Sequence, residues 1–220
     1  MLRPLLALLI GSTALTGAAF GADQVPLKID LPRPLFVGTP RPLKLANLEK
    51  PRAGRRPEMM VPAGTVLLSK GKPVTASDSL PVIGELPLIT DGDKSGSDGT
   101  YVEFGPGVQW VQIDLESPAK IEAVVVWHFH SQARAYHDVI VQVSNDPEFK
   151  KDVQTIYNND DNNSASMGAG SDPSYIETYE GRLIEGKGKT GRYVRLYSNG
   201  NTSDELNHYI EVEVYGQPAK

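Results

Sequence analysis

Short segments in which every second residue is apolar recur along the chain, and they constrain the fold more than any other feature of the sequence. The segments WVQIDL (110–115), DVIVQV (138–143) and YIEVEVYG (209–216) each place three apolar side chains on one face of an extended strand. Clusters of Gly, Asn and Asp separate them, and no window of the sequence has a sustained helical period. The pattern therefore predicts an all-β body.

Further strand candidates complete this body. The segment IEAVVVWHF (121–129) is apolar at most positions, which suits a central strand, and RYVRLYS (192–198) predicts another. Shorter candidates lie at 101–104, 153–157 and 175–179. About eight short strands separated by turn signals predict one jelly-roll β-sandwich over residues 64–220.

The first residues have the composition of a secretory signal peptide. Arg3 precedes an apolar run at 5–10, and the small residues Ala19 and Gly21 suit a cleavage site. No stretch of the sequence reaches the roughly 18 apolar residues that a transmembrane helix needs. We therefore expect a signal peptide at 1–21, no membrane span, and a secreted protein that is extracellular, periplasmic or at the cell surface.

Residues 22–63 differ from the body in composition. They hold eight prolines, eight basic residues and four acidic ones. Proline at this density favours extended conformations and removes backbone donors. We interpret this segment as a Pro-rich basic lead-in, either a linker or a strap lying along the body.

The composition excludes several classes of protein. The body is acidic, and because neutralising phosphates supplies most of the affinity for nucleic acid, we expect no nucleic-acid partner. The chain has no Cys, so disulfides and Cys-ligated zinc are excluded. It also lacks the G-x-S-x-G, H-E-x-x-H, P-loop and Gly-rich dinucleotide motifs. The sequence therefore favours a non-catalytic protein over an enzyme.

The stretch ITDGDKSGSDG (89–99) raises the question of a calcium site. Its acidic and small residues match the first half of an EF-hand loop, but Val102 occupies the position of the closing carboxylate. Nearby prolines also argue against the flanking helices of an EF-hand. An acidic surface turn is the simplest interpretation of the residues themselves.

Six segments of the body occur in an order and spacing typical of one family. They are LLSKGKPVTASDS, LITDGD, VQWVQIDLESPAKIEAVVVW, DVIVQVSNDPEF, GRYVRLYSNG and YIEVEVYG. Together, over about residues 66–216, they resemble the discoidin or coagulation-factor C-type domain. This galactose-binding-like β-sandwich includes many bacterial carbohydrate-binding modules. The resemblance is specific for the fold and much less so for the ligand, because one fold hosts many functions.

The resemblance also implies a structural Ca²⁺ ion. In the carbohydrate-binding members, an Asp of the Asp-Gly turn, nearby loop oxygens and a Glu of the last strand hold the ion. The matching residues here are Leu88, Asp91, Asp93, Ile210 and Glu211. Gly96 departs from the pattern where those modules often place Thr or Ser, so Ser95, Ser97 or a backbone carbonyl would take that place. Such an ion would pin a loop to a distant strand and stabilise the fold.

The segment WHFHSQARAYHD (127–138) contains three of the four histidines and is the candidate ligand site. Carbohydrate-binding relatives hold sugars with His, Arg, Asn and an aromatic ring from loops at one end of the sandwich. The resemblance therefore implies a ligand site made of His130, Arg134, Tyr136, Asn199, Asn201 and Tyr209. We expect Arg134 to be exposed, because it lies in a connection between strands. Two other interpretations stay open: histidines packed at a strand end, and a metal site that lacks an acidic partner nearby.

The stretch YNNDDNNSASMGAGSDPSY (157–175) is a long polar loop. A flexible insertion is the simplest interpretation. Alternatively, Asp160, Asp161 and Asn162 would form a second cation site or a specificity loop.

The sequence as a whole favours a secreted, non-catalytic module that binds a glycan or cell-surface polymer. The alternative is a protein-interaction or structural module of the cell surface or envelope. In that case the Pro-rich lead-in would contact a protein partner.

Overall fold

Strands dominate the computed structural model, which describes residues 23–36 and 42–219 and confirms the all-β prediction. The predicted signal peptide lies outside the described residues. The strands are β1 (Gln24–Pro26), β2 (Met60–Pro62), β3 (Val66–Leu67), β4 (Val74–Ala76), β5 (Val102–Phe104), β6 (Gln109–Trp127), β7 (Ile140–Ser144), β8 (Gln154–Asn158), β9 (Arg182–Ser198), β10 (Asn207–Tyr209) and β11 (Glu211–Pro218). A short 3-10 helix, η1 (Leu86–Thr90), precedes the Asp-Gly turn.

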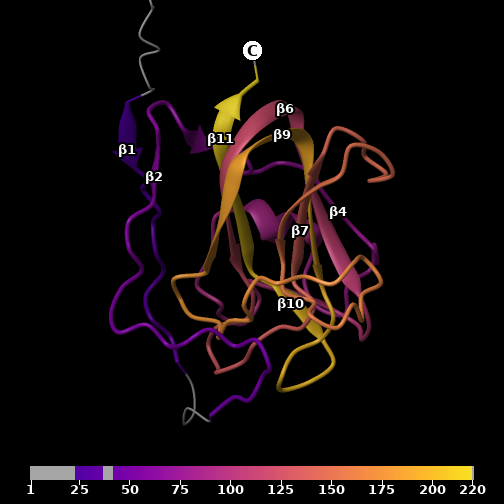
Figure 1. Ribbon diagram of the computed structural model, residues 1–220. Coiled ribbons are helices and arrows are strands. Elements are labelled where there is room, and N and C mark those ends of the chain that lie inside the picture. Colours follow the sequence, from indigo (N-terminus) through magenta and orange to yellow (C-terminus); the bar gives the residue numbers. More distant parts are fainter. Residues whose placement is uncertain (1–22, 37–41, 220) are drawn as a thin grey trace, which may run out of the picture.

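Two long antiparallel strands, β6 and β9, organise the sandwich (Figure 1). The first part of β6 pairs with β4, and its second part pairs with β11. β9 follows β6 along both parts and also pairs with β7, which pairs with β8. Register shifts between Asp114 and Ala119 and between Ile121 and Ala123 bend the pair, so the same two strands belong to both layers.

Two details of the predicted strands were wrong. The segments predicted as separate strands at 110–115 and 121–129 form the single strand β6, because its pairing with β9 stops at Asp114 and resumes at Ala119 after an irregularity. The predicted strand at 175–179 is absent. That segment is held instead by Glu177 N–H donating to the Arg134 carbonyl and by Trp127 Nε1 donating to the Tyr179 carbonyl.

The alternating apolar residues fill the space between the layers. Ile113, Val124, Val141 and Val212 are fully buried, and each belongs to a different one of the predicted strand segments. Burying such side chains stabilises a fold by about 1.5–3 kcal/mol each.

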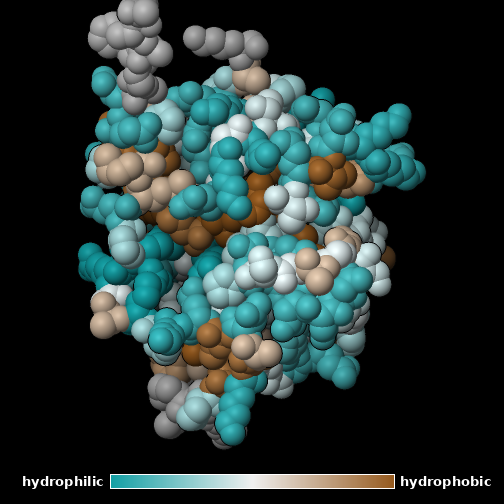
Figure 2. All heavy atoms as spheres, viewed as in Figure 1, coloured by the Kyte–Doolittle hydropathy of each residue, from teal (hydrophilic) through white to brown (hydrophobic). Residues whose placement is uncertain are grey.

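The lead-in lies along one side of the sandwich, where β1 pairs with β2 (Figure 1). Its Leu27, Ile29 and Met59 pack on a second apolar cluster that includes Trp127 and Tyr215. The apolar side chains visible on this side of the molecule lie among hydrophilic ones (Figure 2). Within the described residues, the structure contains no helix with the length and hydropathy of a membrane span.

Candidate functional site

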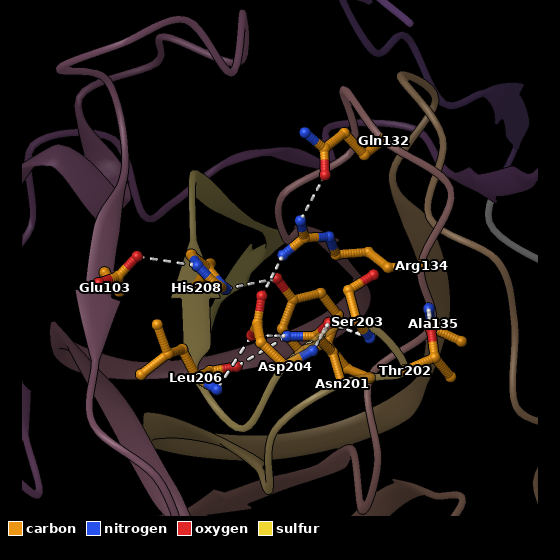
Figure 3. A network of polar contacts seen from close by, with 11 residues as sticks. Glu103, Gln132, Arg134, Ala135, Asn201, Thr202, Ser203, Asp204, Leu206 and His208 are labelled. Atoms are coloured by element: carbon orange, nitrogen blue, oxygen red, sulfur yellow. Dashed lines mark hydrogen bonds and ion pairs between the residues drawn. The ribbon is translucent and has the colours of Figure 1, made fainter. Parts of the chain in front are cut away.

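A network of polar side chains lies at the end of the sandwich that carries β5 and β10 (Figure 3). The β5–β10 pair brings one side of the site together, and the loops that follow β6 and β9 bring the other. Three segments far apart in the sequence therefore meet here, because the loop after β9 continues directly into β10.

Arg134 is at the centre of this network. Its Nη2 donates to Gln132 Oε1 at 3.0 Å, and its Nη1 lies 3.5 Å from Asp204 Oδ2. The guanidinium also lies 4.7 Å from the centre of the Phe129 ring, a cation–π arrangement. The Arg134 side chain is only 6% exposed, so the expectation that it would be exposed was wrong. Its charge is held in place by the loops that fold over it.

A chain of three hydrogen-bonded groups lies beside Arg134. His208 Nε2 is 3.1 Å from Glu103 Oε2, and His208 Nδ1 is 2.8 Å from the Tyr136 hydroxyl. Because an ionised carboxylate only accepts, Nε2 carries the ring hydrogen and the Tyr136 hydroxyl donates to Nδ1. Burial, followed by the charge of Arg134, lowers the pKa of His208 to about 4, so the ring is neutral at pH 7.

Two aromatic rings border the network and stay partly exposed. Tyr101 and Phe129 meet edge to face, with ring centres 5.3 Å apart, and the His208 ring lies 5.7 Å from Phe129. Burial and the nearby Glu103 carboxylate raise the pKa of Tyr101, so its hydroxyl keeps its hydrogen. The site thus combines an apolar aromatic surface with fixed charged groups.

Asn201 shapes the loop that carries Asp204. Its Nδ2 donates to Asp204 Oδ1 at 2.6 Å and to the Leu206 carbonyl at 2.9 Å. Its Oδ1 accepts from the Ser203 N–H, and residue 201 forms a β-bridge with Tyr136. Asn201 therefore acts through Asp204 and Tyr136 and is itself buried.

Three of the six predicted ligand residues lie elsewhere. His130 is 1% exposed and its Nε2 is 3.0 Å from the Lys94 carbonyl, so it contacts the Asp-Gly turn. Tyr209 is fully buried, and its hydroxyl lies 3.1 Å from Ser198 Oγ. Asn199 donates to Asp138 in a separate cleft. Arg134, Tyr136 and Asn201 do come together.

The histidines do not form a metal centre in the described part of the chain, where no group of three or more His, Cys, Asp or Glu residues is suited to an ion. His128 is buried, its Nδ1 lies 2.7 Å from Glu177 Oε1, and its ring stacks on Tyr136 at 4.3 Å. It is a packed histidine at a strand end, which was one of the predicted interpretations.

The Asp-Gly turn meets the last strand. Gly92 N–H donates to Glu211 Oε2 at 3.0 Å, so the turn and β11 are adjacent. Asp91 and Asp93 are exposed and their Oδ1 atoms accept from N–H groups two residues further on. Leu88 lies in η1, and Ile210 immediately precedes β11.

Glu211 gives a test of whether a cation fits this turn. The residue is fully buried, and its Oε1 has no hydrogen-bond partner within the described residues. Burial raises its pKa to about 9, and Glu213 and Asp91 add to the shift, while Gly92 N–H and Lys94 oppose it. A buried carboxylate oxygen with no partner is a costly feature that a bound cation would relieve. Glu211 Oε1 is therefore an oxygen that a cation would suit, while no group of three or more His, Cys, Asp or Glu among the described residues is placed to hold an ion.

Six residues of the network were absent from the sequence prediction: Tyr101, Glu103, Phe129, Gln132, Asp204 and His208. Tyr101 and Glu103 alternate on one predicted strand, which places both on the same face. Phe129, Asp204 and His208 lie in segments that were predicted to contribute to the site. The missing information was which side chains of these loops face one another.

Residues 88–196 match the family model of the NedA-like, galactose-binding domain of the F5/F8 type C group. The match covers just under half of the chain and confirms the predicted resemblance to the discoidin or coagulation-factor C-type domain. A comparison with curated proteins finds no match.

Solved structures share this fold at low sequence identity. A family 89 glycoside hydrolase from Clostridium perfringens, in complex with 2-acetamido-1,2-dideoxynojirmycin, aligns with a TM-score of 0.51 at 16% identity. The alignment covers 70% of this chain and 15% of the hydrolase. Chitosan-binding module 1 of a Paenibacillus chitosanase/glucanase aligns with a TM-score of 0.44 at 23% identity, covering 69% of this chain and 99% of the module.

Proposed function

We propose that this protein is a secreted, non-catalytic carbohydrate-binding module and that the Arg134 network is its glycan site. One observation carries the proposal: the partly exposed Tyr101 and Phe129 rings lie beside charged groups that the fold holds in place. Sugars present an apolar C–H face and several hydroxyls, and this pairing of surfaces matches both. The family and the carbohydrate-binding modules among its structural neighbours support the same class of ligand.

The residues divide into contacting and positioning groups. Phe129 and Tyr101 offer the surface on which a sugar ring would stack. Asp204, whose side chain is 38% exposed, and the exposed Gln132 offer acceptors and donors for hydroxyls. Arg134 positions Asp204, Gln132 and Phe129 because it contacts all three and is itself nearly inaccessible.

A structural calcium ion is part of the proposal. Asp91, Asp93 and Glu211 would hold it with side-chain or backbone oxygens, and Leu88 and Ile210 with backbone carbonyls. The unpartnered Oε1 of Glu211 supports this assignment. The ion would tie the Asp-Gly turn to β11 and supply no chemistry at the glycan site.

A protein-interaction module remains the second candidate because of one apolar loop. Leu80, Val82 and Ile83 are 82%, 63% and 39% exposed, and the loop lies beside Glu103 through backbone hydrogen bonds. Exposed apolar residues gathered in one loop are typical of a protein contact. The described part of the lead-in, by contrast, packs on its own body.

The glycan proposal is tested by a glycan array followed by isothermal titration with the best sugar. Phe129→Ala should weaken binding at least tenfold, about 1.4 kcal/mol, with little change in melting temperature. Phe149→Ala is the matched control, because Phe149 also has an arginine over its ring, Arg195 at 4.2 Å, at another place on the body. Equal affinity of Phe129→Ala and wild type would move the site elsewhere. An empty array with calcium present would favour the protein-interaction candidate.

A further inference from the structure

A second cleft, of about 400 Å³, lies next to the start of β7. Its walls come from three parts of the chain: lead-in residues 45–47, the residues just before β7 and just after β9, which lie at the same end of that pair, and the polar loop after β8. Asp138, Asn159, Asp161, Asn162 and Asn199 supply most of its polar groups. We call it the Asp138 cleft. Its volume is within the range of small-molecule sites, about 300–1,000 Å³.

The polar groups of the Asp138 cleft are fixed before any ligand arrives. Asp138 is 7% exposed, and its Oδ2 accepts from Asn199 Nδ2 at 2.7 Å and from Ser164 Oγ at 2.6 Å. Asn159 is 4% exposed, and its Oδ1 accepts from the Val139 N–H at 2.7 Å. Asn159 Nδ2 has no hydrogen-bond partner within the described residues. Asn159 lines the cleft, but its Nδ2 has almost no solvent contact, so a ligand would reach that donor only if a neighbouring side chain moved aside.

The loop after β8 is internally bonded rather than a loose insertion. Asp160 is fully buried and accepts from the Ser164 and Ala165 N–H groups at 2.9 Å each. Gly170 N–H donates back to the Asp160 carbonyl at 2.7 Å. The wall that carries Asp161 and Asn162 is therefore built by the fold.

The lining decides the chemical class of ligand. Several asparagine amides offer paired donors and acceptors, which suit adjacent sugar hydroxyls. The lining includes the Asp138 and Asp161 carboxylates and no Lys or Arg. An acidic sugar would therefore be repelled, whereas a neutral or amino sugar would not.

We propose that the Asp138 cleft is a second saccharide site that takes a neutral or amino sugar unit, with the lead-in as one wall. This inference rests on the proposed glycan-binding function and extends it. The polar loop after β8 would then act as a specificity loop, selecting by charge. A chain with two such sites would bind a polymer more tightly than either site alone.

Nuclear magnetic resonance on the full mature chain tests the inference site by site. Glucosamine, galactose and galacturonic acid are titrated separately while the amide signals are followed. Glucosamine and galactose should shift the NMR signals of the Asn159 and Asn199 side-chain amides. Galacturonic acid should leave these signals unchanged. These shifts should persist in Phe129→Ala and weaken at least tenfold for glucosamine in Asp161→Lys. Glu148→Lys is the matched control, since it makes the same charge change on an exposed loop.

Each other outcome is decisive. Shifts confined to residues around Phe129 would overturn the second site and leave the proposed function intact. If calcium chloride shifts the signals of residues in the Asp138 cleft and none of the sugars does, the cleft is a cation site instead. No shift with any sugar at either site would overturn both proposals together.

Discussion

His208 shows how burial turns an ordinary side chain into a pH-sensitive one. Its pKa is lowered to about 4 in the fold and is about 6.5 in an unfolded chain. Between these values the unfolded state binds more protons at this residue, so the contribution of His208 to the free energy of unfolding should be lost as the pH falls from about 6.5 to about 4. We expect the melting temperature of His208→Gln to depend less on pH over this window than the melting temperature of wild type. A folded-state NMR titration in which His208 protonates near pH 6.5 would contradict the prediction.

Gly181 is a residue whose lack of a side chain the fold requires. It has φ 64°, and a Cβ there would lie 2.6 Å from Trp127 Cε2. Gly188 has φ 65°, but a Cβ there would meet only the flexible Lys120 Cε at 3.0 Å. Both Ala substitutions should cost about 1–2 kcal/mol for the left-handed backbone. Gly181→Ala should cost about 1–3 kcal/mol more through the clash with the Trp127 ring.

Chemical denaturation measures the difference between the two variants. Equal loss of stability in Gly181→Ala and Gly188→Ala would show that the Trp127 ring moves aside without cost. Trp127 fluorescence should change in Gly181→Ala alone.

At the scale of elements, the junction of the Asp-Gly turn with β11 should respond to calcium and pH together. The pKa of Glu211 is raised to about 9 from an ordinary 4.5, so without a cation the folded state holds a proton that the unfolded state releases. The contribution of Glu211 to stability without calcium should therefore be fully present below about pH 4.5 and be lost as the pH rises toward 9. Calcium should remove most of this fall, because it compensates the buried carboxylate.

Melting curves in EDTA and in millimolar calcium, taken from pH 5 to 9, measure this effect. Glu211→Gln should melt higher than wild type in EDTA at pH 8 and lower than wild type in calcium. Glu205→Gln, an exposed change in a loop, is the control. A wild-type melting curve that is the same in calcium and in EDTA at every pH would contradict the calcium assignment.

The elements also show what the sequence can and cannot predict. Alternation located most strands because one face of each is buried in the same core. It divided β6 in two because nothing local indicates that the pairing with β9 resumes at Ala119. The resemblance placed His130 at the ligand site, yet its partner is the Lys94 carbonyl. Contacts between distant loops depend on how the layers stack, which periodicity does not encode.

At the scale of the whole molecule, the lead-in is expected to stabilise the body without being needed to fold it. Leu27, Ile29 and Met59 cover the outer cluster, and Arg56 Nη1 donates to the Glu180 and Gly181 carbonyls at 3.2 and 2.9 Å. The main core between the layers contains no residue of the lead-in among those described. A chain beginning at Gly64 should therefore keep its strand content by circular dichroism and melt several degrees lower.

Arg56→Ala changes one residue of the lead-in instead of removing it. This variant should also lower the melting temperature, but by less than the truncation does. Arg55→Ala, which alters the neighbouring exposed arginine, should change little. Loss of all strand signal on truncation would show that the lead-in belongs to the folding core.

The bent β6–β9 pair has a consequence for how the molecule opens. Because both layers hydrogen-bond to the same two strands, neither layer can separate while β6 and β9 remain joined. Transient openings that expose the buried amides of Val124 and Val194 must then expose both layers at once. These amides should exchange with deuterium at one common slow rate set by global unfolding, whereas those of β1 and β2 exchange far sooner.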